Sequence, residues 1–338
     1  MRNPDYTQLL KVLNNEVPDR PTLFEFFLND PLYEILDNGE APLRNDEYDM
    51  MRKRIYGFKN AGYDYCSMQG CDFHFPQKER ERKSTMSLND AGSIIDWETY
   101  EDYSWPNPEA WNYEPYLVNL AKDLPEGMKF LVMGPCGVLE NAIALVGYEN
   151  LCVMLYEEPE LTKQIFDDIG SRLVRYYDIS AEYDSVFAII SNDDWGFKTQ
   201  TMLSTEDMRK YVFPWHKKIA DVARKHNKPV ILHSCGQLED VMDDIIDDIG
   251  FNGKHSFEDT IIPIEDAYEK HKGRVALLGG LDVDFMCRST PEEVSLRAKA
   301  MLERAATDGG YALGTGNSVP EYVPHENYFA MIDVIRKS

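Results

Sequence analysis

This chain has no run of apolar residues long enough to cross a lipid bilayer, for which about 20 consecutive apolar residues are needed. The first five residues are polar and do not begin the apolar core of a signal peptide. We therefore expect a protein of the cytoplasm that has no membrane partner.

Cysteine is scarce, with six residues scattered over a chain of 338. Without an export signal, this pattern argues against a framework of disulfides and favours a reducing compartment. A cysteine with a function is therefore expected to act as a free thiol or as a metal ligand.

Positive charge is also in short supply, since 35 lysines and arginines face 59 aspartates and glutamates, for a net charge of −24. The phosphates of a nucleic acid would be repelled, so we expect no nucleic-acid partner. The short segment Gly314-Thr315-Gly316 lacks the third glycine of a dinucleotide-binding fingerprint. A P-loop, a His-Glu-x-x-His motif and a nucleophile elbow are likewise missing.

What the chain does have is a regular alternation of short β-rich runs with longer amphipathic runs. The eight strand candidates are residues 21–27, 63–68, 129–133, 187–192, 229–233, 253–257, 275–279 and 311–314. Helical patterns cover residues 159–183, 204–226, 238–249, 264–272, 290–306 and 325–337. Most strand candidates are apolar along their whole length, as buried parallel strands are. The alternation predicts an α/β protein whose residues 1–338 form a single (β/α)8 TIM barrel.

One segment, residues 70–125, is longer than a crossover between the second and third predicted strands requires. Residues 83–88 and 93–97 flank a turn-like Asn89-Asp90-Ala91-Gly92, which predicts an inserted hairpin. Tryptophans and tyrosines follow up to Tyr116. We expect this insertion near the barrel mouth, either as a lid or docking surface or as an aromatic cluster that holds the segment in place.

The strongest chemical signal is His233-Ser234-Cys235-Gly236, which follows the apolar run 229–232. Alternate residues of a strand point to the same side, so His233 and Cys235 are expected to converge at a strand end. An imidazole and a thiolate suit zinc, which needs about three protein ligands in a catalytic site. Glu258 and His255 are candidates for the remaining ligand. The alternative is a buried histidine beside an inert core thiol.

Active sites of such barrels lie at the carboxyl ends of the strands, which nominates further residues. Asp193 and Asp194 are candidate catalytic carboxylates, as is Glu258, unless they only cap helices or form ion pairs. The candidates for substrate binding are Glu25, Phe27, Met68, Trp195, His255 and Asn317.

Several motifs together resemble the uroporphyrinogen decarboxylase superfamily, in particular its corrinoid-linked methyltransferase branch. They are residues 147–150, 158–160, 192–196, 232–236, 278–283 and 313–316. The resemblance covers nearly the whole chain. It implies a TIM barrel and, in the branch that uses coenzyme M, a zinc ion bound by His-x-Cys and a later cysteine. His233 and Cys235 match the first two ligands, whereas Thr315 occupies the third position.

The resemblance to the decarboxylase itself is weaker near the amino terminus, in the segment that binds its substrate. That enzyme holds its acidic tetrapyrrole with an arginine-rich segment near the amino terminus, where this chain has Arg20 followed by the apolar and acidic residues 21–27. A substrate with many carboxylates is therefore disfavoured.

The resemblance leads to the hypothesis of a zinc-dependent methyltransferase that demethylates a methoxylated substrate. The methyl group would pass to the Co(I) of a corrinoid carried by a partner protein, with zinc or Asp194 stabilising the departing oxygen. An aryl methyl ether is the preferred donor, because phenolate leaves more readily than alkoxide. Aromatic residues that could stack on it are Phe24, Phe26, Phe27, Tyr65, Phe73, Phe75 and Trp195.

Three alternatives remain open at this point. The first is methyl transfer from a methyl-corrinoid to a thiol such as coenzyme M. The others are a decarboxylase of the uroporphyrinogen type and a non-catalytic barrel that binds a corrinoid protein or a small ligand.

Overall fold

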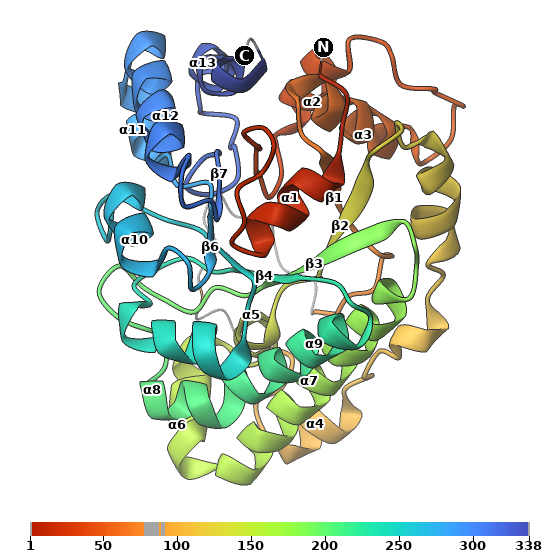
Figure 1. Ribbon diagram of the computed structural model, residues 1–338. Helices are drawn as coiled ribbons and strands as arrows, with labels where there is room; N and C mark the ends of the chain where they lie inside the picture. The colour runs from red at the N-terminus through yellow and green to blue at the C-terminus, as the bar shows by residue number, and fades with distance from the viewer. Residues whose placement is uncertain (1, 78–87, 89–91, 337–338) are drawn as a thin grey trace.

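The computed structural model describes residues 2–77, 88 and 92–336. Seven parallel strands form one sheet in the order β1-β2-β3-β4-β5-β6-β7. They are β1 (Tyr65–Gln69), β2 (Lys129–Met133), β3 (Val186–Asn192), β4 (Val230–His233), β5 (Gly253–His255), β6 (Ala276–Leu278) and β7 (Tyr311–Ala312). The sheet curls as in a TIM barrel, with helices outside it (Figure 1). The predicted α/β class with a parallel, barrel-like sheet is confirmed.

The first predicted strand, residues 21–27, is not a strand among the described residues. It contributes isolated bridges, from Leu23 to Leu313 and, just beyond its end, from Leu28 to Val319. On the β1 side, side-chain hydroxyls replace the backbone ladder. The hydroxyl of Tyr65 accepts from the Glu25 amide at 2.8 Å and donates to the Glu25 carbonyl at 2.6 Å. The prediction of eight strands is thus wrong by one. On its β1 side, the segment 21–27 forms hydrogen bonds with side chains, whereas a strand would pair with the backbone of β1.

The helices follow the predicted alternation. They are α1 (Tyr6–Leu13), α2 (Asp30–Asp37), α3 (Asp49–Ala61), α4 (Trp97–Asp102), α5 (Val138–Val146), α6 (Tyr148–Glu157), α7 (Pro159–Ala181), α8 (Thr205–Asp207), α9 (Phe213–Lys225), α10 (Ile264–His271), α11 (Val283–Arg288), α12 (Pro291–Ala305) and α13 (His325–Arg336). Short 3₁₀ or π turns cover residues 108–110, 115–119, 120–123, 208–212, 239–241 and 244–249. The helix predicted over 238–249 is therefore made of two such turns.

Helix α1 covers the amino ends of the strands, in front of the sheet in Figure 1. The amide of Tyr6 donates to the carbonyl of Gly127, just before β2. The Leu13 side chain lies so close to Gly253, the first residue of β5, that an added Cβ would come within 2.8 Å of it. Helix α1 therefore covers this end of the barrel.

The insertion lies between β1 and β2, and its described part differs from the predicted hairpin. Residues 83–87 of the first arm and residues 89–91 of the turn lie outside the described residues. The second arm, 93–97, is not a strand, because the Asp96 carboxylate accepts from the Thr99 amide at 2.8 Å and caps α4 at Trp97. Thr99 returns a bond to the Asp96 amide at 3.1 Å, which completes a capping box.

The aromatic residues of the insertion pack on each other and on α7. Phe73 stacks on Tyr176 of α7, with ring centroids 5.7 Å apart. Arg172 of α7 lies over the ring of Trp105 at 5.0 Å, and Tyr103 meets the same tryptophan at 4.7 Å. These contacts fasten the segment to the barrel wall.

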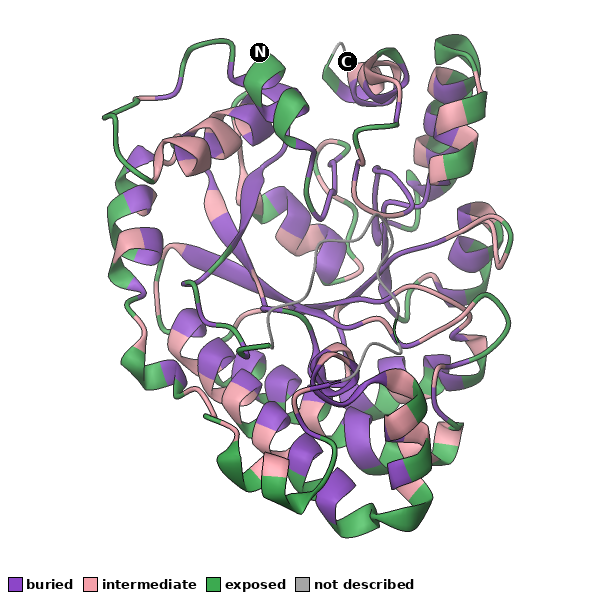
Figure 2. Ribbon diagram, turned by 180° about the vertical axis from the view of Figure 1, so that it is seen from behind, coloured by how far each residue is buried: buried purple, intermediate pink, exposed green. Residues whose placement is uncertain are grey.

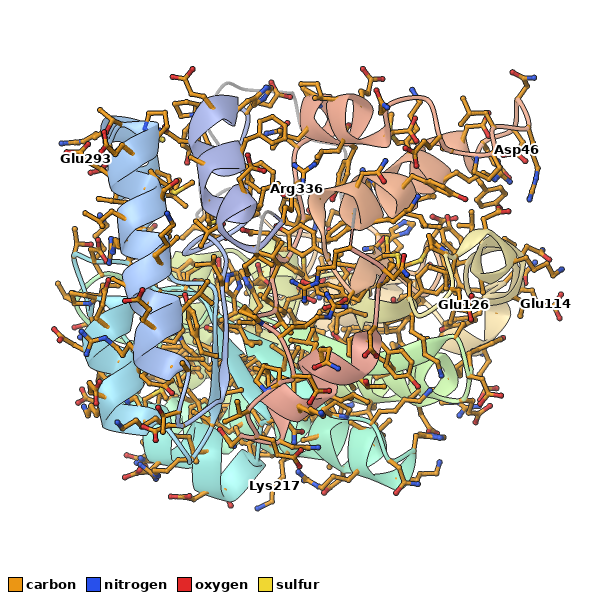
Figure 3. All side chains as sticks on the ribbon, turned by 45° about the horizontal axis from the view of Figure 1, so that its top comes forward. Asp46, Glu114, Glu126, Lys217, Glu293 and Arg336 are labelled. Atoms are coloured by element: carbon orange, nitrogen blue, oxygen red, sulfur yellow. The ribbon has the colours of Figure 1, made fainter. Side chains whose placement is uncertain are left out.

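Burial follows the architecture, with buried strands at the centre and exposed helix faces outside (Figure 2). Charged side chains such as Glu114, Lys217 and Glu293 lie on the outer surface (Figure 3). In the described part of the chain, no single helix is long and apolar enough to cross a membrane. Only the pair α5 and α6, bent by 95°, meets that test when joined, and it does so by length and composition alone.

Candidate active site

The candidate site forms where three neighbouring strands end. In the sheet register Asn192, His233 and His255 lie side by side, at the ends of β3, β4 and β5. Ladder bonds continue past these ends, since the Asp193 amide donates to the His233 carbonyl at 2.9 Å. Residues that follow the three strands are thereby held next to each other.

Two glycines let the loops after β3 and β4 approach closely. Gly236 has φ +90°, and an added Cβ there would lie 2.2 Å from the carbonyl carbon of Gly196. This close backbone contact requires glycine. The Cys235 amide also donates to Asp194 Oδ1 at 3.0 Å. The packing of the two loops therefore brings Asp194 to Cys235.

His233, Cys235 and Asp194 form a cluster of donors. One nitrogen, the sulfur and one carboxylate oxygen all lie within 4.8 Å of one another. Three such donors match the number and type of protein ligands in a catalytic zinc site. The other comparable group among the described residues, Asp178 with Glu182 and His226, has an ordinary role, because its Asp178 is already paired with lysine and arginine side chains.

The electrostatics of the cluster favour a bound cation. Burial lowers the pKa of His233 well below its usual value, with the neighbouring His255 acting in the same direction, so its imidazole is neutral. Burial, together with the Asp194 carboxylate, raises the pKa of the Cys235 thiol to about 12. A divalent cation would reverse that effect and favour the thiolate. The donor set therefore fits zinc.

A second layer of bonds supports His233. Its Nδ1 lies 2.8 Å from Nδ1 of His255, and Nε2 of His255 lies 3.3 Å from the carbonyl oxygen of Thr315. The ring of Phe26 stacks on His233 at 4.2 Å between centroids. His255, predicted to bind substrate, is completely buried and contacts His233.

Another set of bonds leads to Cys235 from Glu25. Glu25 Oε1 accepts from the Thr315 amide at 2.7 Å, and its Oε2 lies 2.8 Å from the Thr315 hydroxyl. That hydroxyl donates to the Asn317 carbonyl at 2.5 Å, and Asn317 Nδ2 donates to Cys235 Sγ at 3.3 Å. Burial raises the pKa of Glu25 to about 8, against the effect of both Thr315 bonds. A protonated Glu25 supplies the hydrogen for the Thr315 hydroxyl, which leaves that hydroxyl free to donate onward.

Asp193, predicted as a catalytic carboxylate, lies on the other side of the loop from Asp194. Its oxygens accept from the amides of Leu139 and Glu140 at the start of α5, both at 2.9 Å. They also accept from Trp195 Nε1 at 3.0 Å and lie 2.9 Å from His216 Nε2. Asp193 is thus occupied in joining β3 to α5 and α9.

Trp195, predicted to bind substrate, is fully buried beside that aspartate. Its ring packs on Phe213 at 5.0 Å and on His216 at 4.8 Å. The other aromatic residues predicted to stack on a substrate are also buried, except Phe27, which is 42% exposed. Met68 is a buried core residue of β1.

A cavity of about 610 Å³ lies beside the cluster. Its lining includes Lys198, Phe257, Glu258, Asp282, Asn317 and Tyr322. Asn317 connects it to the cluster through its bond to Cys235. The size suits a small organic substrate. Glu258, predicted as a metal ligand, lines this cavity, while the described donor group of His233 and Cys235 contains Asp194 instead.

Sequence reasoning did not single out Lys254 or Ser256. The Lys254 amine is buried, donates to the Ser256 carbonyl and lies 4.1 Å from the centre of the Phe257 ring. Burial lowers its pKa to about 8. The Ser256 hydroxyl donates to Cys235 Sγ at 3.4 Å. A lysine and a serine beside a strand carry no signal in sequence, because only the neighbouring strand brings them to Cys235.

The chain is similar to known proteins of two kinds, decarboxylases and methyltransferases. The chain is 27% identical over 207 residues to the uroporphyrinogen decarboxylase of Anaeromyxobacter dehalogenans, which covers 60% of this chain and 56% of that protein. It is 27% identical over 133 residues to the methylcobamide:CoM methyltransferase MtbA of Methanosarcina acetivorans, 39% of this chain and 37% of that protein. The chain spans about half the length of the curated decarboxylases that it matches.

A solved methyltransferase from Methanosarcina mazei has the same fold, with a TM-score of 0.72 at 17% identity over 99% of both chains. The sequence profile described as "Uroporphyrinogen decarboxylase (URO-D)" matches residues 92–338, which include every member of the donor cluster. The chain therefore belongs to the uroporphyrinogen decarboxylase (URO-D) family.

Proposed function

We propose that this protein is a zinc-dependent methyltransferase that removes the methyl group from a methoxylated small molecule. The observation that carries the proposal is the convergence of Asp194, His233 and Cys235 beside a cavity of about 610 Å³. In this proposal Asp194 takes the ligand position at which coenzyme M-dependent relatives have a cysteine.

The donor set has a chemical consequence. A zinc ion with one sulfur ligand keeps more positive charge than one with two, and when bound it supplies Lewis-acid stabilisation of the oxygen that loses its methyl group. The C–O bond breaks, its electron pair stays on that oxygen, and the methyl group goes to the acceptor. The chain's own residues bind and orient the donor.

Residues of the cavity are assigned to the donor. Glu258 and Asn317 supply a carboxyl and an amide group for its polar substituents. Phe257 and Tyr322 supply aromatic surface. An aryl methyl ether remains the preferred donor, because its phenolate leaves more readily than an alkoxide.

The acceptor in this proposal is the Co(I) of a corrinoid carried by a partner protein. Support comes from the name of one relative, which transfers a methyl group from a methylcobamide. Because the amino end of the barrel is covered by α1, the partner has to approach the opposite end, where the cluster lies.

The same relative favours a second candidate, methyl transfer from a methyl-corrinoid to a thiol. Thr315 argues against it, since a site with a single thiolate is less suited to delivering an electron-rich sulfur acceptor. A tetrapyrrole decarboxylase is disfavoured because Arg20 is bound to Asp64 at 2.7 Å and to the Asn3 carbonyl at 2.9 Å, at the covered end.

The experiment has two stages. Metal analysis of protein from zinc-replete growth is expected to give about one zinc per chain, and a zinc-free protein would contradict the ligand assignment. The protein is then incubated with a reduced corrinoid protein and a panel of methoxyaromatics, and methyl-Co(III) is followed by absorbance. Failure across the panel, combined with demethylation of methyl-Co(III) by coenzyme M, would support the thiol-directed alternative.

A further inference from the structure

The contact between His233 and His255 has a specific consequence for where hydrogen atoms lie. We propose that His255 is a positioning residue that holds the hydrogen of His233 on Nδ1 and so keeps Nε2 free for a metal ion. The inference rests on the proposed metal site and goes beyond it, because it assigns a role to a residue that cannot itself be a ligand of the cluster.

The hydrogen assignment starts at Thr315. A carbonyl oxygen only accepts, so the His255 nitrogen 3.3 Å away, Nε2, carries a hydrogen. A neutral imidazole has one hydrogen, which leaves Nδ1 of His255 as an acceptor. The nitrogen 2.8 Å from it, Nδ1 of His233, must then be the donor. His233 is left with an unprotonated Nε2.

Neutrality of the pair follows from its surroundings. Both rings are buried, which disfavours an imidazolium, and their hydrogen bonds among the described residues go to each other and to a carbonyl oxygen. The Asp194 carboxylate has an oxygen within 4.8 Å of a His233 nitrogen, but it accepts its hydrogen bond from the Cys235 amide. When both rings are neutral, only one of the two facing Nδ1 atoms carries a hydrogen. The bond from Nε2 of His255 to the Thr315 carbonyl assigns that hydrogen to His233.

The rings cannot turn to exchange their nitrogens. Phe26 stacks on His233, and the ring of Phe24 meets His255 edge-on at 5.1 Å. Gly279, at φ +69°, lies so close that an added Cβ would come within 3.1 Å of His255 Cδ2 and Nε2 and 2.2 Å from the Thr315 carbonyl oxygen. The backbone of the loop after β6 thus holds both the ring and its acceptor.

This arrangement also gives Thr315 a role. Its carbonyl bonds His255, and its amide and hydroxyl bond Glu25. The same hydroxyl bonds the carbonyl of Asn317, whose side-chain amide donates to Cys235. Thr315, which occupies the position of a third cysteine ligand, therefore contacts residues that support His233 and Cys235 and is not itself assigned as a ligand. Bonds of this outer kind fix ligand orientation, and their loss commonly lowers metal affinity by about 10- to 100-fold.

Two variants of nearly equal size test the proposal. In His255→Asn the side-chain oxygen still accepts from Nδ1 of His233, whereas His255→Leu removes the acceptor. The full-length protein and both variants are stripped with a chelator, and their affinities for Zn²⁺ are measured by competition. We expect His255→Leu to bind Zn²⁺ about 10- to 100-fold more weakly and His255→Asn to stay within about threefold of the unsubstituted protein.

Histidine tautomers are measured directly on the metal-free protein by long-range ¹H–¹⁵N NMR with ¹⁵N-labelled histidine. The chain has seven histidines, and His233→Gln identifies the signals of His233. We expect the Nδ1–H form of His233 in the unsubstituted protein and in His255→Asn, and a mixture of forms in His255→Leu. The tautomer of the unsubstituted protein decides the question even if His255→Leu does not fold.

The outcomes separate this inference from the proposed function. Tight Zn²⁺ binding together with an Nε2–H form of His233 would overturn the role of His255 alone. Equal Zn²⁺ affinity of the two variants would overturn it as well. An unsubstituted protein that binds no Zn²⁺ would overturn the metal site on which the proposed function depends.

Discussion

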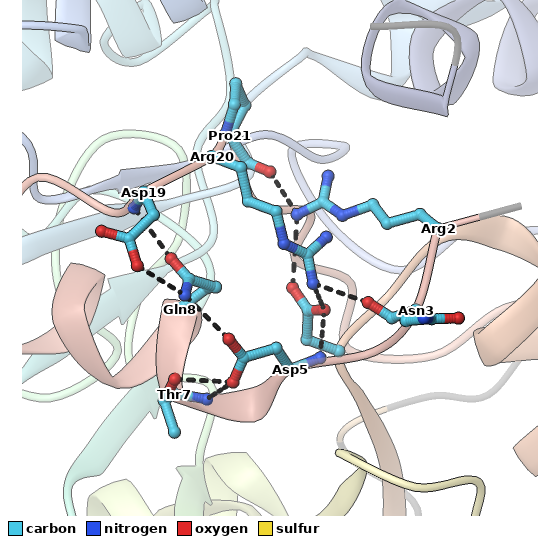
Figure 4. A network of polar contacts seen from close by, with 9 residues as sticks. Arg2, Asn3, Asp5, Thr7, Gln8, Asp19, Arg20 and Pro21 are labelled. Atoms are coloured by element: carbon cyan, nitrogen blue, oxygen red, sulfur yellow. Dashed lines mark hydrogen bonds and ion pairs between the residues drawn. The ribbon is translucent and has the colours of Figure 1, made fainter.

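The two ends of the barrel treat their buried polar groups in opposite ways. Before β1, the buried carboxylate of Asp64 is bonded to Arg20 at 2.7 Å and to Arg2 at 3.5 Å, and it accepts from the Asp5 amide at 2.8 Å (Figure 4). At the other end, the side chain of buried Glu25 is hydrogen-bonded, within the described part of the chain, only to the amide and hydroxyl of Thr315. At the amino end the buried carboxylate is paired with arginines, whereas at the carboxyl end the buried Glu25 has no cationic partner among the described contacts.

This difference suggests that the polar groups of the amino end stabilise the fold, whereas those of the carboxyl end are available to bind a ligand. A carboxylate with arginine partners is satisfied and has nothing left for a ligand. The carboxyl ends of the strands instead keep a thiol, two neutral imidazoles and the Asp194 carboxylate, without a cationic side chain bonded to any of them among the described contacts. A site built this way is prepared for an external cation.

The largest effect is expected from removing a ligand at the carboxyl end. His233→Ala and Cys235→Ala should each lose the metal and lower methyl transfer by at least about 1,000-fold, while the unfolding midpoint changes little relative to metal-free protein. Metal analysis and the methyl-Co(III) assay measure this. His226→Ala, which removes a histidine bonded to Asp178, is the matched control and should keep both metal and activity. Equal losses in the control would show that the two ends do not differ.

A second effect concerns the pH dependence of stability. The pKa of Glu25 is raised to about 8, so the folded state keeps a proton that the unfolded state releases above its ordinary pKa of 4.5. The contribution is therefore full below pH 4.5 and is lost as pH rises to about 8, by up to a few kcal/mol. Glu25→Gln imitates the protonated form and should flatten this part of the profile in urea unfolding at several pH values. An unchanged slope would mean that Glu25 is ionised in the folded protein.

A smaller effect is expected at the amino end. Arg20→Met leaves the buried carboxylate of Asp64 with weaker compensation and should lower the free energy of unfolding by about 2 to 3 kcal/mol. Zinc affinity and methyl transfer at 25 °C should stay unchanged, because the network lies at the covered end. Urea unfolding and the two activity measurements check this. A loss of zinc in this variant would break the proposed separation of the two ends.

The smallest effect is expected from an exposed pair in the same network. Lys11 lies 2.7 Å from Asp19, whose side chain is 70% exposed. Exposed ion pairs contribute little. Lys11→Met should therefore leave the unfolding midpoint and the activity indistinguishable from those of the unsubstituted protein. A clear destabilisation would show that the stability of the network depends on the exposed Lys11–Asp19 pair as well as on the buried Asp64.

Much of the fold was predictable because its signals are local. Apolar runs placed seven strands within a few residues, and helical periodicity placed α7, α9, α10, α12 and α13, whereas α1 to α6 and α11 were not predicted. Residues 93–97 were misassigned because they follow a turn-like segment that suggests a hairpin, although Asp96 with Thr99 carries the signal of a capping box. The segment 21–27 has the composition of a strand, but its hydrogen-bond partners on the β1 side are side chains of Tyr65 and Ser67.

The site was predictable only in outline. The convergence of His233 and Cys235 follows from their spacing at a strand end. The spacing does not distinguish Asp194 from Glu258 as a third donor, because both follow strand ends. The distinction comes from the contact of Gly196 with Gly236, two glycines 40 positions apart in the numbering.

By itself, the sequence determined the order of strands and helices, the family, and which donor atoms arrive at the carboxyl ends, because these depend on periodicity and on residue identity. Only the tertiary structure decided that Asp193 joins helices while its neighbour Asp194 faces Cys235, that burial raises the pKa of Glu25 and that Nδ1 of His233 lies against Nδ1 of His255. Burial and hydrogen-bond partners settle such properties, and in this fold the partners come from strands that are distant in the chain.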